Sequence, residues 1–354
     1  MTGLLETEIR AALAGNLAPG CTVEVIGADS LPSCFDVSEL AVASLRAAAG
    51  EIGTLTGAAT ITLEQRLALK WFDMTVRPVG WSLPSIWDPV AGDYRTRDGW
   101  IRLHTNAPHH RAAALSALGC EGIREAVAAT VLQRGKDELE SAVVAAGGCA
   151  AAMRGLADWA AHPQGIAVAA EPLIAWERVP QDAAKFASPS GLSGLKVLDL
   201  TRVLAGPVAT RFLAAYGADV LRIDPPSWNE PPVEAEVTLG KTCAGLDLHR
   251  AEDRVIFERL LAEADFLIHG YRPGALENLG YDAETRRRIN PRHIEVTLCA
   301  YGWTGPWSGR RGFDSLVQMS SGIAAEGMAR AGSETPKPLP VQALDHATGY
   351  LMAA

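Results

Sequence analysis

The protein has 354 residues, of which 48% are apolar and 21% are charged, and its formal net charge is −9. Chains of this size and composition fold as about two domains with buried cores, and the negative charge argues against a broad surface for nucleic acid or anionic membranes. No apolar run is long enough to span a bilayer, and the stretch MTGLLETEIRAALAG lacks the basic start and apolar run of a signal peptide. We therefore expect a cytoplasmic protein.

The first part of the chain, residues 1–180, is predicted to form a mostly helical domain. Apolar residues recur at helical spacing in three Ala-rich stretches, which are ELAVASLRAAAGEIG (residues 39–53), HHRAAALSALG (109–119) and KDELESAVVAAGG (136–148). Thr62 is predicted to cap a further helix, because Gln65 follows three residues later. Between these helices, DYRT and WIRLHT flank Asp98 and Gly99, a pair that is typical of hairpin turns.

The six cysteines indicate reduced thiols rather than disulfides or a zinc site. None of them forms a CxxC pair, and no two stand at zinc-ligand spacing. His104, His109 and His110 resemble a metal cluster only superficially, because no carboxylate stands at ligand spacing beside them. We therefore expect no bound metal, mostly buried thiols, and surface or interface roles for the three histidines.

The pattern changes after residues 181–194, a segment with Pro, Ser and Gly that is predicted to be a linker. From residue 195 onwards, short apolar runs alternate with helical stretches. The runs are LKVLDLT (195–201), DVLRID (219–224), CAGLDL (243–248), DFLIHG (265–270) and HIEVTLCAYG (293–302). This alternation is typical of an open, doubly wound parallel sheet. The sequence thus predicts an α/β, Rossmann-like domain over residues 195–354, preceded by the mostly helical domain.

Ligands of open parallel sheets bind beyond the carboxyl ends of the strands, where this sequence places several basic residues. They are Arg202, Arg222, Lys241 and Arg272. Guanidinium groups suit phosphate oxygens because they donate hydrogen bonds in a fixed fork, although each of these residues equally fits a solvated loop charge. The loop TRVLAGPVAT after the first strand lacks GxGxxG, and no GxxxxGK[ST] motif occurs. We therefore expect no NAD, FAD or P-loop nucleotide.

Five stretches of this half, taken together and in order, resemble the class III CoA-transferase family, also called the CaiB/BaiF family. They are GLKVLDLTRVLAGPVATRFLAAYGADVLRIDPP, LGKTCAGLDL, ADFLIHGYRPGALENLGYD, INPRHIEVTLCAYGWTGPWSGRRGFDSLVQMSSGIA and ALDHATG. The resemblance implies transfer of CoA between carboxylic acids, with an acyl-CoA and a carboxylic acid as substrates and no resident cofactor. It also implies an interlocked homodimer, or a second subunit.

The same resemblance implies which residues contact CoA. The expected contacts are Arg202, Ala205, Arg222, Lys241 and Arg272. Two stretches of the first half also resemble the family. DPVAGDYRTRDGWIRLHT and GGCAAAMRGLADWAAHPQG resemble the small-domain and C-terminal segments, which in ordinary members follow the α/β half.

Asp345, in ALDHATG, matches the position of the family's nucleophilic aspartate, whose carboxylate attacks the acyl-CoA thioester. The small residues 347–349 would then let backbone N–H groups approach the developing oxyanion. Without the resemblance, Asp345 reads as an N-cap for a helix that starts at His346, and the two roles are compatible. His346 is expected to contact substrate or solvent. A short helix after Asp345 must dock on another element.

Asp314 is a competing carboxylate, in Gly-Phe-Asp where the racemase branch of the family has Gly-His-Asp. Phe313 cannot transfer a proton, which argues against racemisation and leaves Asp314 a supporting role. The sequence therefore leaves three functions open. They are a CoA-transferase, an acyl-CoA racemase or isomerase, and a non-catalytic CoA-binding or partner subunit that needs a second chain.

Overall fold

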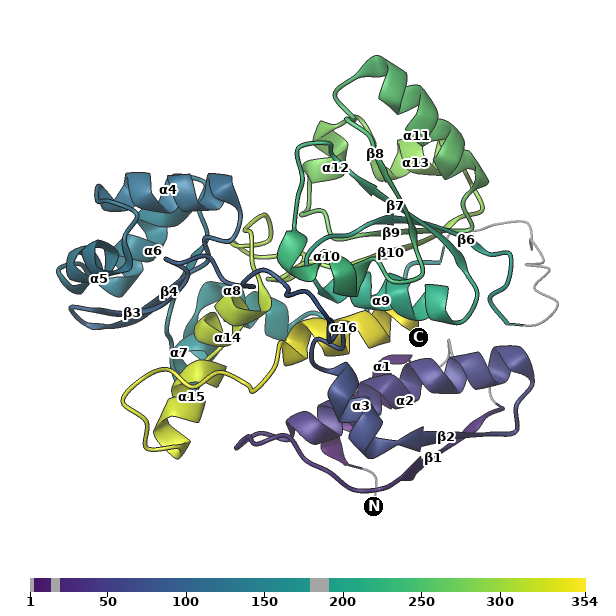
Figure 1. The fold of residues 1–354 in the computed structure, drawn as a ribbon, viewed down its shortest axis with the longest axis horizontal. Coiled ribbons are helices and arrows are strands. Elements are labelled where there is room, and N and C mark those ends of the chain that lie inside the picture. Colours follow the sequence, from purple (N-terminus) through teal and green to yellow (C-terminus); the bar gives the residue numbers. More distant parts are fainter. Residues whose placement is uncertain (1–2, 14–19, 179–190) are drawn as a thin grey trace.

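The computed structural model describes residues 3–13, 20–178 and 191–354 (Figure 1). Residues 181–190 of the predicted linker lie outside the described part. Leu192, near the linker's end, is buried in a core cluster with Val197 and Val220. No helix in the described ranges is long and apolar enough to cross a bilayer. All six cysteines are free, but only Cys149 is buried, so the prediction of mostly buried thiols was wrong.

A five-stranded parallel sheet forms the centre of the second half, as the alternating pattern predicts. Its strands are β6 (Lys196–Leu200), β7 (Asp219–Asp224), β8 (Thr242–Gly245), β9 (Phe266–His269) and β10 (Ile294–Thr297). Their order is β10-β9-β6-β7-β8, and all pairs are parallel. The chain therefore reverses its winding direction between β6 and β9, where ligands of such sheets bind.

Helices cover both faces of this sheet. The predicted helices are α9 (Ala205–Ala215), α11 (Ala251–Glu263) and α13 (Ala283–Ile289), and two short ones were missed, α10 (Pro231–Val237) and α12 (Ala275–Asn278). Figure 1 shows α11, α12 and α13 above the sheet and α9 and α10 below it. This arrangement confirms the doubly wound α/β class.

The chain begins with a helical unit that also contains two strands. Its elements are α1 (Leu4–Leu13), β1 (Thr22–Ile26), α2 (Val37–Thr56), β2 (Thr60–Glu64) and α3 (Gln65–Trp71), with β1 and β2 parallel. Thr62 lies within β2, so its predicted capping role was wrong. Glu64 caps α3 instead, because its carboxylate accepts the backbone N–H groups of Arg66 and Leu67.

A second unit of the first half is built on a three-stranded antiparallel sheet of β3 (Gly92–Thr96), β4 (Gly99–Leu103) and β5 (Ala150–Ala152). The predicted hairpin around Asp98 and Gly99 joins β3 to β4. Helices α4 (Pro108–Leu118), α5 (Arg124–Leu132) and α6 (Lys136–Ala145) share a core with this sheet, and α7 (Leu156–Ala161) and α8 (Pro163–Ala169) follow β5 in the chain. Two helices from the far end of the sequence join them, α14 (Asp314–Ser320) and α15 (Ile323–Arg330).

Helix α16 (Ala343–Ala353) lies between α9 of the α/β half and α2 of the N-terminal unit (Figure 1). Its buried residues Ala343, Ala347 and Tyr350 share one core with α2 and α9. Gly349 allows the close approach, since a Cβ there would lie 2.6 Å from the Ala205 carbonyl oxygen. The two neighbours thus provide the docking surface that the short helix after Asp345 requires.

Candidate active site at the first turn of helix α16

Asp345 is the third residue of α16, which begins at Ala343 and is preceded by Gln342 as N-cap residue. Asp345 is therefore not a helix cap, and the predicted start at His346 was wrong. Its side chain is partly buried, and no described residue donates a hydrogen bond to its carboxylate. A carboxylate without a partner in a partly buried position is available to react with a bound ligand.

Asp314, the first residue of α14, supplies the cap that Asp345 does not. Its Oδ2 atom accepts the backbone N–H groups of Leu344 at 2.9 Å and of Asp345 at 3.2 Å. Its Oδ1 atom accepts a hydrogen bond from the side-chain amide of Gln318. The amide oxygen of Gln318 in turn accepts a hydrogen bond from the backbone N–H of Leu339. Capping by a carboxylate satisfies N–H groups that the helix leaves unpaired and favours the helix dipole. Asp314 thus holds the first turn of α16 in place, which agrees with its expected supporting role.

Both carboxyl groups bind a proton more tightly than ordinary aspartates do, and Asp314 contributes to this effect at Asp345. Burial raises the pKa of Asp314 to about 6, although hydrogen bonds from Gln318 and α16 oppose the shift. Burial, and then the negative charge of Asp314, raise the pKa of Asp345 well above its usual range. Two interacting acids titrate as a pair. The arrangement makes Asp345 more basic than an ordinary aspartate, and a more basic carboxylate is the better nucleophile once it is ionised.

His346 does not face substrate or solvent, so that expectation was wrong. It is 1% exposed, and its ring stacks on Phe72 with 5.5 Å between ring centroids. Burial lowers the pKa of His346 to about 4, so the ring is neutral at neutral pH. It is a core residue that joins α16 to the segment after α3.

The backbone N–H groups of residues 347–349 are not available to an oxyanion. These residues lie inside α16, where i→i−4 bonds occupy the N–H groups. The small residues serve packing instead: a Cβ at Gly349 would also lie 2.7 Å from Val208 of α9. The predicted oxyanion role of residues 347–349 was therefore wrong.

The first half of the chain packs directly against this site. The ring of Phe313 stacks on that of His104 at 3.7 Å and lies 5.8 Å from that of His110. His104 and His110 are buried, whereas His109 is exposed, so a surface role holds for His109 alone. No three metal-ligating side chains gather within the described ranges.

Arg202 and Arg272, two of the expected CoA contacts, lie at the point where the sheet reverses its winding. The Arg202 guanidinium donates to the Tyr271 hydroxyl at 2.9 Å and to Asp224 at 3.2 Å, which bridges the ends of β6, β7 and β9. Arg272 donates to the Gly309 carbonyl oxygen at 2.7 Å. Both side chains are only partly buried, so they keep access to a ligand at the strand ends.

Arg222 and Lys241 are instead engaged inside the protein. Arg222 is 2% exposed and forms ion pairs with Asp224 and Glu230. The Lys241 ammonium is buried and lies 3.0 Å from an oxygen of Asp199. Sequence alone reveals these cations but not the carboxylates that the fold brings to them. Both cations are therefore paired with carboxylates in this structure.

Ala205, the remaining expected contact, opens α9 directly after an unusual turn. Val203 has a φ of +69°, the one left-handed residue other than glycine in the described chain. A β-branched residue adopts this conformation only when its surroundings impose it, and such strain gathers at ligand sites. Sequence reasoning missed this feature, since nothing in TRVLAGPVAT signals it.

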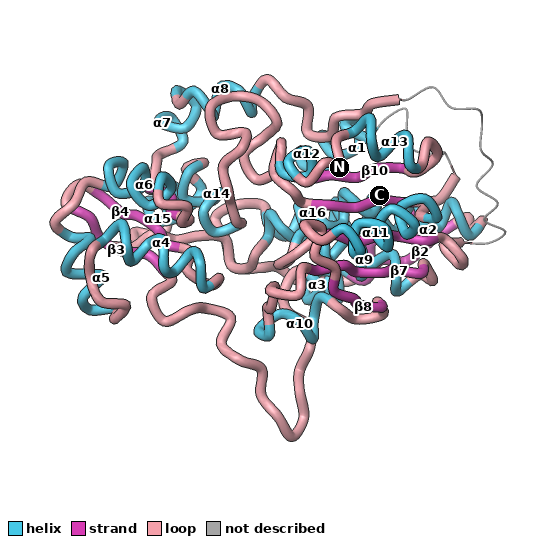
Figure 2. Tube along the Cα trace, turned by 90° about the horizontal axis from the view of Figure 1, so that it is seen from above, coloured by secondary structure: helices cyan, strands magenta, loops and turns pink. Residues whose placement is uncertain are grey.

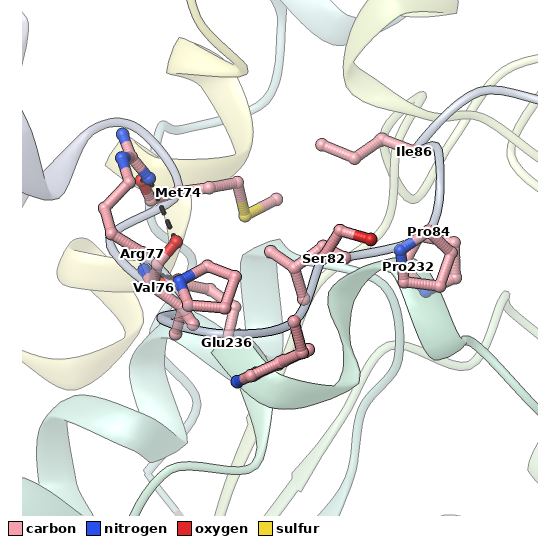
Figure 3. Close-up of a pocket in the computed structure, with 11 residues that line it drawn as sticks. Met74, Val76, Arg77, Ser82, Pro84, Ile86, Pro232 and Glu236 are labelled. Carbon is pink, nitrogen blue, oxygen red and sulfur yellow. Dashed lines mark hydrogen bonds between the residues drawn. The ribbon is translucent and has the colours of Figure 1, made fainter.

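A pocket of about 380 Å³ lies elsewhere, between the loop that follows α3 and the start of α10 (Figure 3). Its lining includes Met74, Trp81 and Ile86 from the loop and Pro232 and Glu236 from α10. Neither Asp345 nor any expected CoA contact lines it, so the candidate site rests on the carboxylate pair and the strand ends.

Comparison with known proteins places the second half of the chain. Residues 192–354 match the model of CoA-transferase family III. An acyl-CoA transferase of Fusarium pseudograminearum is 33% identical over 157 residues, which are 38% of this chain and 34% of the relative. An acetyl-CoA:oxalate CoA-transferase of Acetobacter aceti is 36% identical over 39% of each chain. A succinate–glutarate CoA-transferase of Agrobacterium fabrum is 34% identical over 37% of this chain and 38% of the relative.

The matched part is thus between a third and two fifths of the length of these curated relatives. A crystal structure of a hypothetical protein from Mycobacterium tuberculosis aligns with 46% of this chain and 48% of its own, at 31% identity and a TM-score of 0.40. A CaiB/BaiF family protein of Brucella suis gives 32% identity and a TM-score of 0.39 over 46% and 47% of the two chains. The match to CoA-transferase family III thus covers residues 192–354, which hold the parallel sheet and the Asp314–Asp345 pair.

Proposed function

We propose that the protein transfers CoA between carboxylic acids, with Asp345 as the nucleophile. The observation that carries the proposal is the Asp345 carboxylate itself. It is partly buried, has no described hydrogen-bond partner and is made more basic by Asp314. The matched relatives support the substrate class, because their names state CoA transfer to or from oxalate, succinate and glutarate.

The proposed reaction proceeds through covalent intermediates on Asp345. The carboxylate attacks the thioester carbonyl of acyl-CoA, which breaks the C–S bond, forms a mixed anhydride and releases CoA thiolate. The thiolate attacks the aspartyl carbonyl of the anhydride, which yields an aspartyl-CoA thioester and the first carboxylate product. The acceptor carboxylate then repeats these two steps in reverse, which leaves a new acyl-CoA and regenerates Asp345. Each step exchanges one carboxylate or thiolate for another, so no oxidant or metal is needed.

CoA is proposed to lie over the carboxyl ends of the strands, as in other open parallel sheets. Arg202 and Arg272 are the contacts that this structure leaves partly buried, and Ala205, which is itself buried, provides the first backbone N–H group of α9. An uncapped helix start of this kind suits phosphate oxygens. Arg222 and Lys241 would then act indirectly, by holding Asp224 and Asp199 at the strand ends.

The protein is also proposed to act as a homodimer. The loop between α3 and β3 extends away from the rest of the chain (Figure 2) and carries exposed apolar side chains, with Val79 92% and Trp81 56% exposed. Exposed apolar groups of this size are typical of contact surfaces. Light scattering of the purified protein should give twice the mass of one chain.

Label exchange tests the activity. The protein is incubated with succinyl-CoA or acetyl-CoA and ¹³C-labelled succinate, glutarate or oxalate, and the label in the CoA ester is followed by mass spectrometry. We expect label to enter the ester with the wild type, and the rate to fall at least a thousandfold in Asp345→Asn, which retains the shape but not the charge. Asp73→Asn, an exposed carboxylate outside the site, is the control.

The same experiment separates the alternative functions. Binding of CoA by wild type and Asp345→Asn without any label exchange would overturn the transferase proposal and favour a non-catalytic partner subunit. Uptake of deuterium from solvent at the α-carbon of a 2-methylacyl-CoA would favour racemisation instead.

A further inference from the structure

Four basic side chains gather where α4 of the first half meets the loop that leads into α14. This basic cluster consists of His109, His110, Arg272 and Arg311. The rings of His109 and His110 are 4.1 Å apart, and that of His110 lies 5.8 Å from Phe313, two residues after Arg311. Arg272 donates a hydrogen bond to the carbonyl oxygen of Gly309, which lies in the same loop as Arg311. The loop of residues 309–313 therefore brings the cluster together from three distant parts of the sequence.

In the part of the chain that the structure describes, no carboxylate forms an ion pair with a member of the basic cluster. Burial, and then Arg311, lower the pKa of Arg272. Burial, followed by His109, Arg311 and Arg272, lowers the pKa of His110 to about 4. Within the described ranges, no residue accepts a hydrogen bond from the Arg311 guanidinium or pairs with it. Two arginines that repel each other across a partly buried space call for an anion between them.

Unsatisfied donors gather at the same place. His110 is 3% exposed, yet neither of its ring nitrogens has a partner in the described chain. A neutral imidazole carries one N–H group that needs an acceptor. His109 and His110 are also the second and third residues of the eleven-residue helix α4, whose N-cap residue Ala107 has no side-chain oxygen to offer. The partial positive charge of the helix start thus adds to that of the arginines.

We propose that the basic cluster is an oxyanion-binding site, which takes a carboxylate or phosphate group of a ligand. The forks of Arg272 and Arg311 donate to the oxyanion, and the His110 ring and the start of α4 supply the remaining donors. The group bound there is either the second carboxylate of a dicarboxylic acid or a phosphate of CoA, since the same donors recognise both. The site does not depend on Asp345 being a nucleophile, because it involves other residues and needs no covalent step.

Calorimetric titration of the full chain tests this site without any turnover. The probes are inorganic phosphate, adenosine 3′,5′-bisphosphate, succinate and butyrate. The variants are Arg311→Gln, Arg311→Lys and, as a matched loss of one charge, Arg292→Gln, whose side chain is exposed just before β10. We expect Arg311→Gln to weaken binding about 10- to 100-fold, as the loss of a charged hydrogen-bond partner does. Arg311→Lys should retain most of the affinity, and Arg292→Gln should change it less than about twofold.

The probes distinguish the two sources of the oxyanion. Binding of the bisphosphate that depends on Arg311 assigns the site to CoA, whereas Arg311-dependent binding of succinate but not butyrate assigns it to a dicarboxylic acid. If no probe binds the wild type, or if Arg311→Gln and Arg292→Gln behave alike, the proposal is wrong. Arg272→Gln replaces Arg311→Gln if that variant does not fold. Asp345→Asn should bind the probes like the wild type, so failure of the catalytic proposal and failure of this one are separable.

Discussion

Asp345 and Asp314 are close enough to affect each other's ionisation, and this coupling makes the reactivity of Asp345 depend on pH. Only the ionised carboxylate can attack a thioester, and the raised pKa means that the ionised fraction falls when the pH drops through that value. Asp314 is one cause of the raised pKa. Its charge therefore affects the pH below which activity falls, which is the acid limb of the pH–activity profile.

Asp314→Asn should therefore move the acid limb of CoA exchange to lower pH. The amide keeps an oxygen that accepts the N–H groups of Leu344 and Asp345, but removes the negative charge that raises the pKa of Asp345. The pH dependence of kcat/KM measures the shift, with Asp73→Asn as the control. A limb that stays in place, or moves to higher pH, would contradict the coupling.

Asp345→Asn should stabilise the fold at pH 8 while it abolishes exchange. An acid whose folded pKa is raised binds its proton more tightly in the folded than in the unfolded chain, so it costs stability once the pH exceeds its unfolded value near 3.8. Urea unfolding at pH 8 should show a gain for the variant, and the gain should vanish as the pH falls well below 3.8, where both states of the wild type are protonated. Equal differences at both pH values would show that the Asp345 charge is not destabilised.

At the scale of elements, the position of Asp345 depends on how closely α16 approaches α9. Gly349 permits this approach, because a side chain there would meet the Ala205 carbonyl oxygen and Val208 at under 3 Å. A Cβ added at Gly50, inside α2, would make only an ordinary van der Waals contact, at 3.6 Å from its nearest neighbour. The same substitution should therefore have opposite effects in the two helices.

Gly349→Ala should destabilise the protein by about 1–3 kcal/mol, since an extra methyl group in a full contact forces the helices apart. Gly50→Ala should instead be neutral or stabilise by up to about 1 kcal/mol, because alanine is the better helix former. Denaturant unfolding measures both changes. If Gly349→Ala is as mild as Gly50→Ala, the α9–α16 contact is not tight.

The sequence predicted the parallel sheet well because each buried strand is a short apolar run between helical patterns. It missed β1 and β2, since TVEVI and TITLE mix polar with apolar residues and lie mostly at the surface. For the site, it singled out Asp345 through its family position. It did not predict that Asp314, 31 residues earlier, caps α16, because no local pattern reports a contact between distant segments. For the same reason it treated Arg222 and Lys241 as ligand contacts or solvated charges, although Arg222 pairs with Asp224 and Glu230 and Lys241 pairs with Asp199.

On the scale of the whole molecule, the two halves are joined by a buried network of charges. Glu140 of α6 forms ion pairs with Arg154 of the first half at 2.6 Å and with Arg310 of the second half at 2.9 Å. All three side chains are less than 10% exposed. Removing one partner of a buried ion pair leaves the remaining charges buried without a partner of opposite charge.

Glu140→Ala should therefore destabilise the protein by about 3–5 kcal/mol. Glu138→Ala, two residues away in the same helix, should change stability by less than about 1 kcal/mol, because its side chain is 61% exposed. Thermal and urea unfolding of the two variants make the comparison. Similar small losses in both would mean that the network does not hold the halves together.

The first half also completes the surroundings of the site, since His104 stacks on Phe313 and α2 supports α16. The segment that matches family III thus has elements of the first half packed against the helix that carries Asp345. The central proposal is that this assembly performs covalent catalysis through Asp345.

Trapping the intermediate tests that claim most directly. The protein is incubated with succinyl-CoA or acetyl-CoA, treated with hydroxylamine, digested and analysed by mass spectrometry. We expect a hydroxamate on Asp345 in the wild type, none in Asp345→Asn, and none on Asp314 in either. A chain that binds acyl-CoA but yields no adduct on Asp345, or yields it on another carboxylate, would show that Asp345 is not the nucleophile.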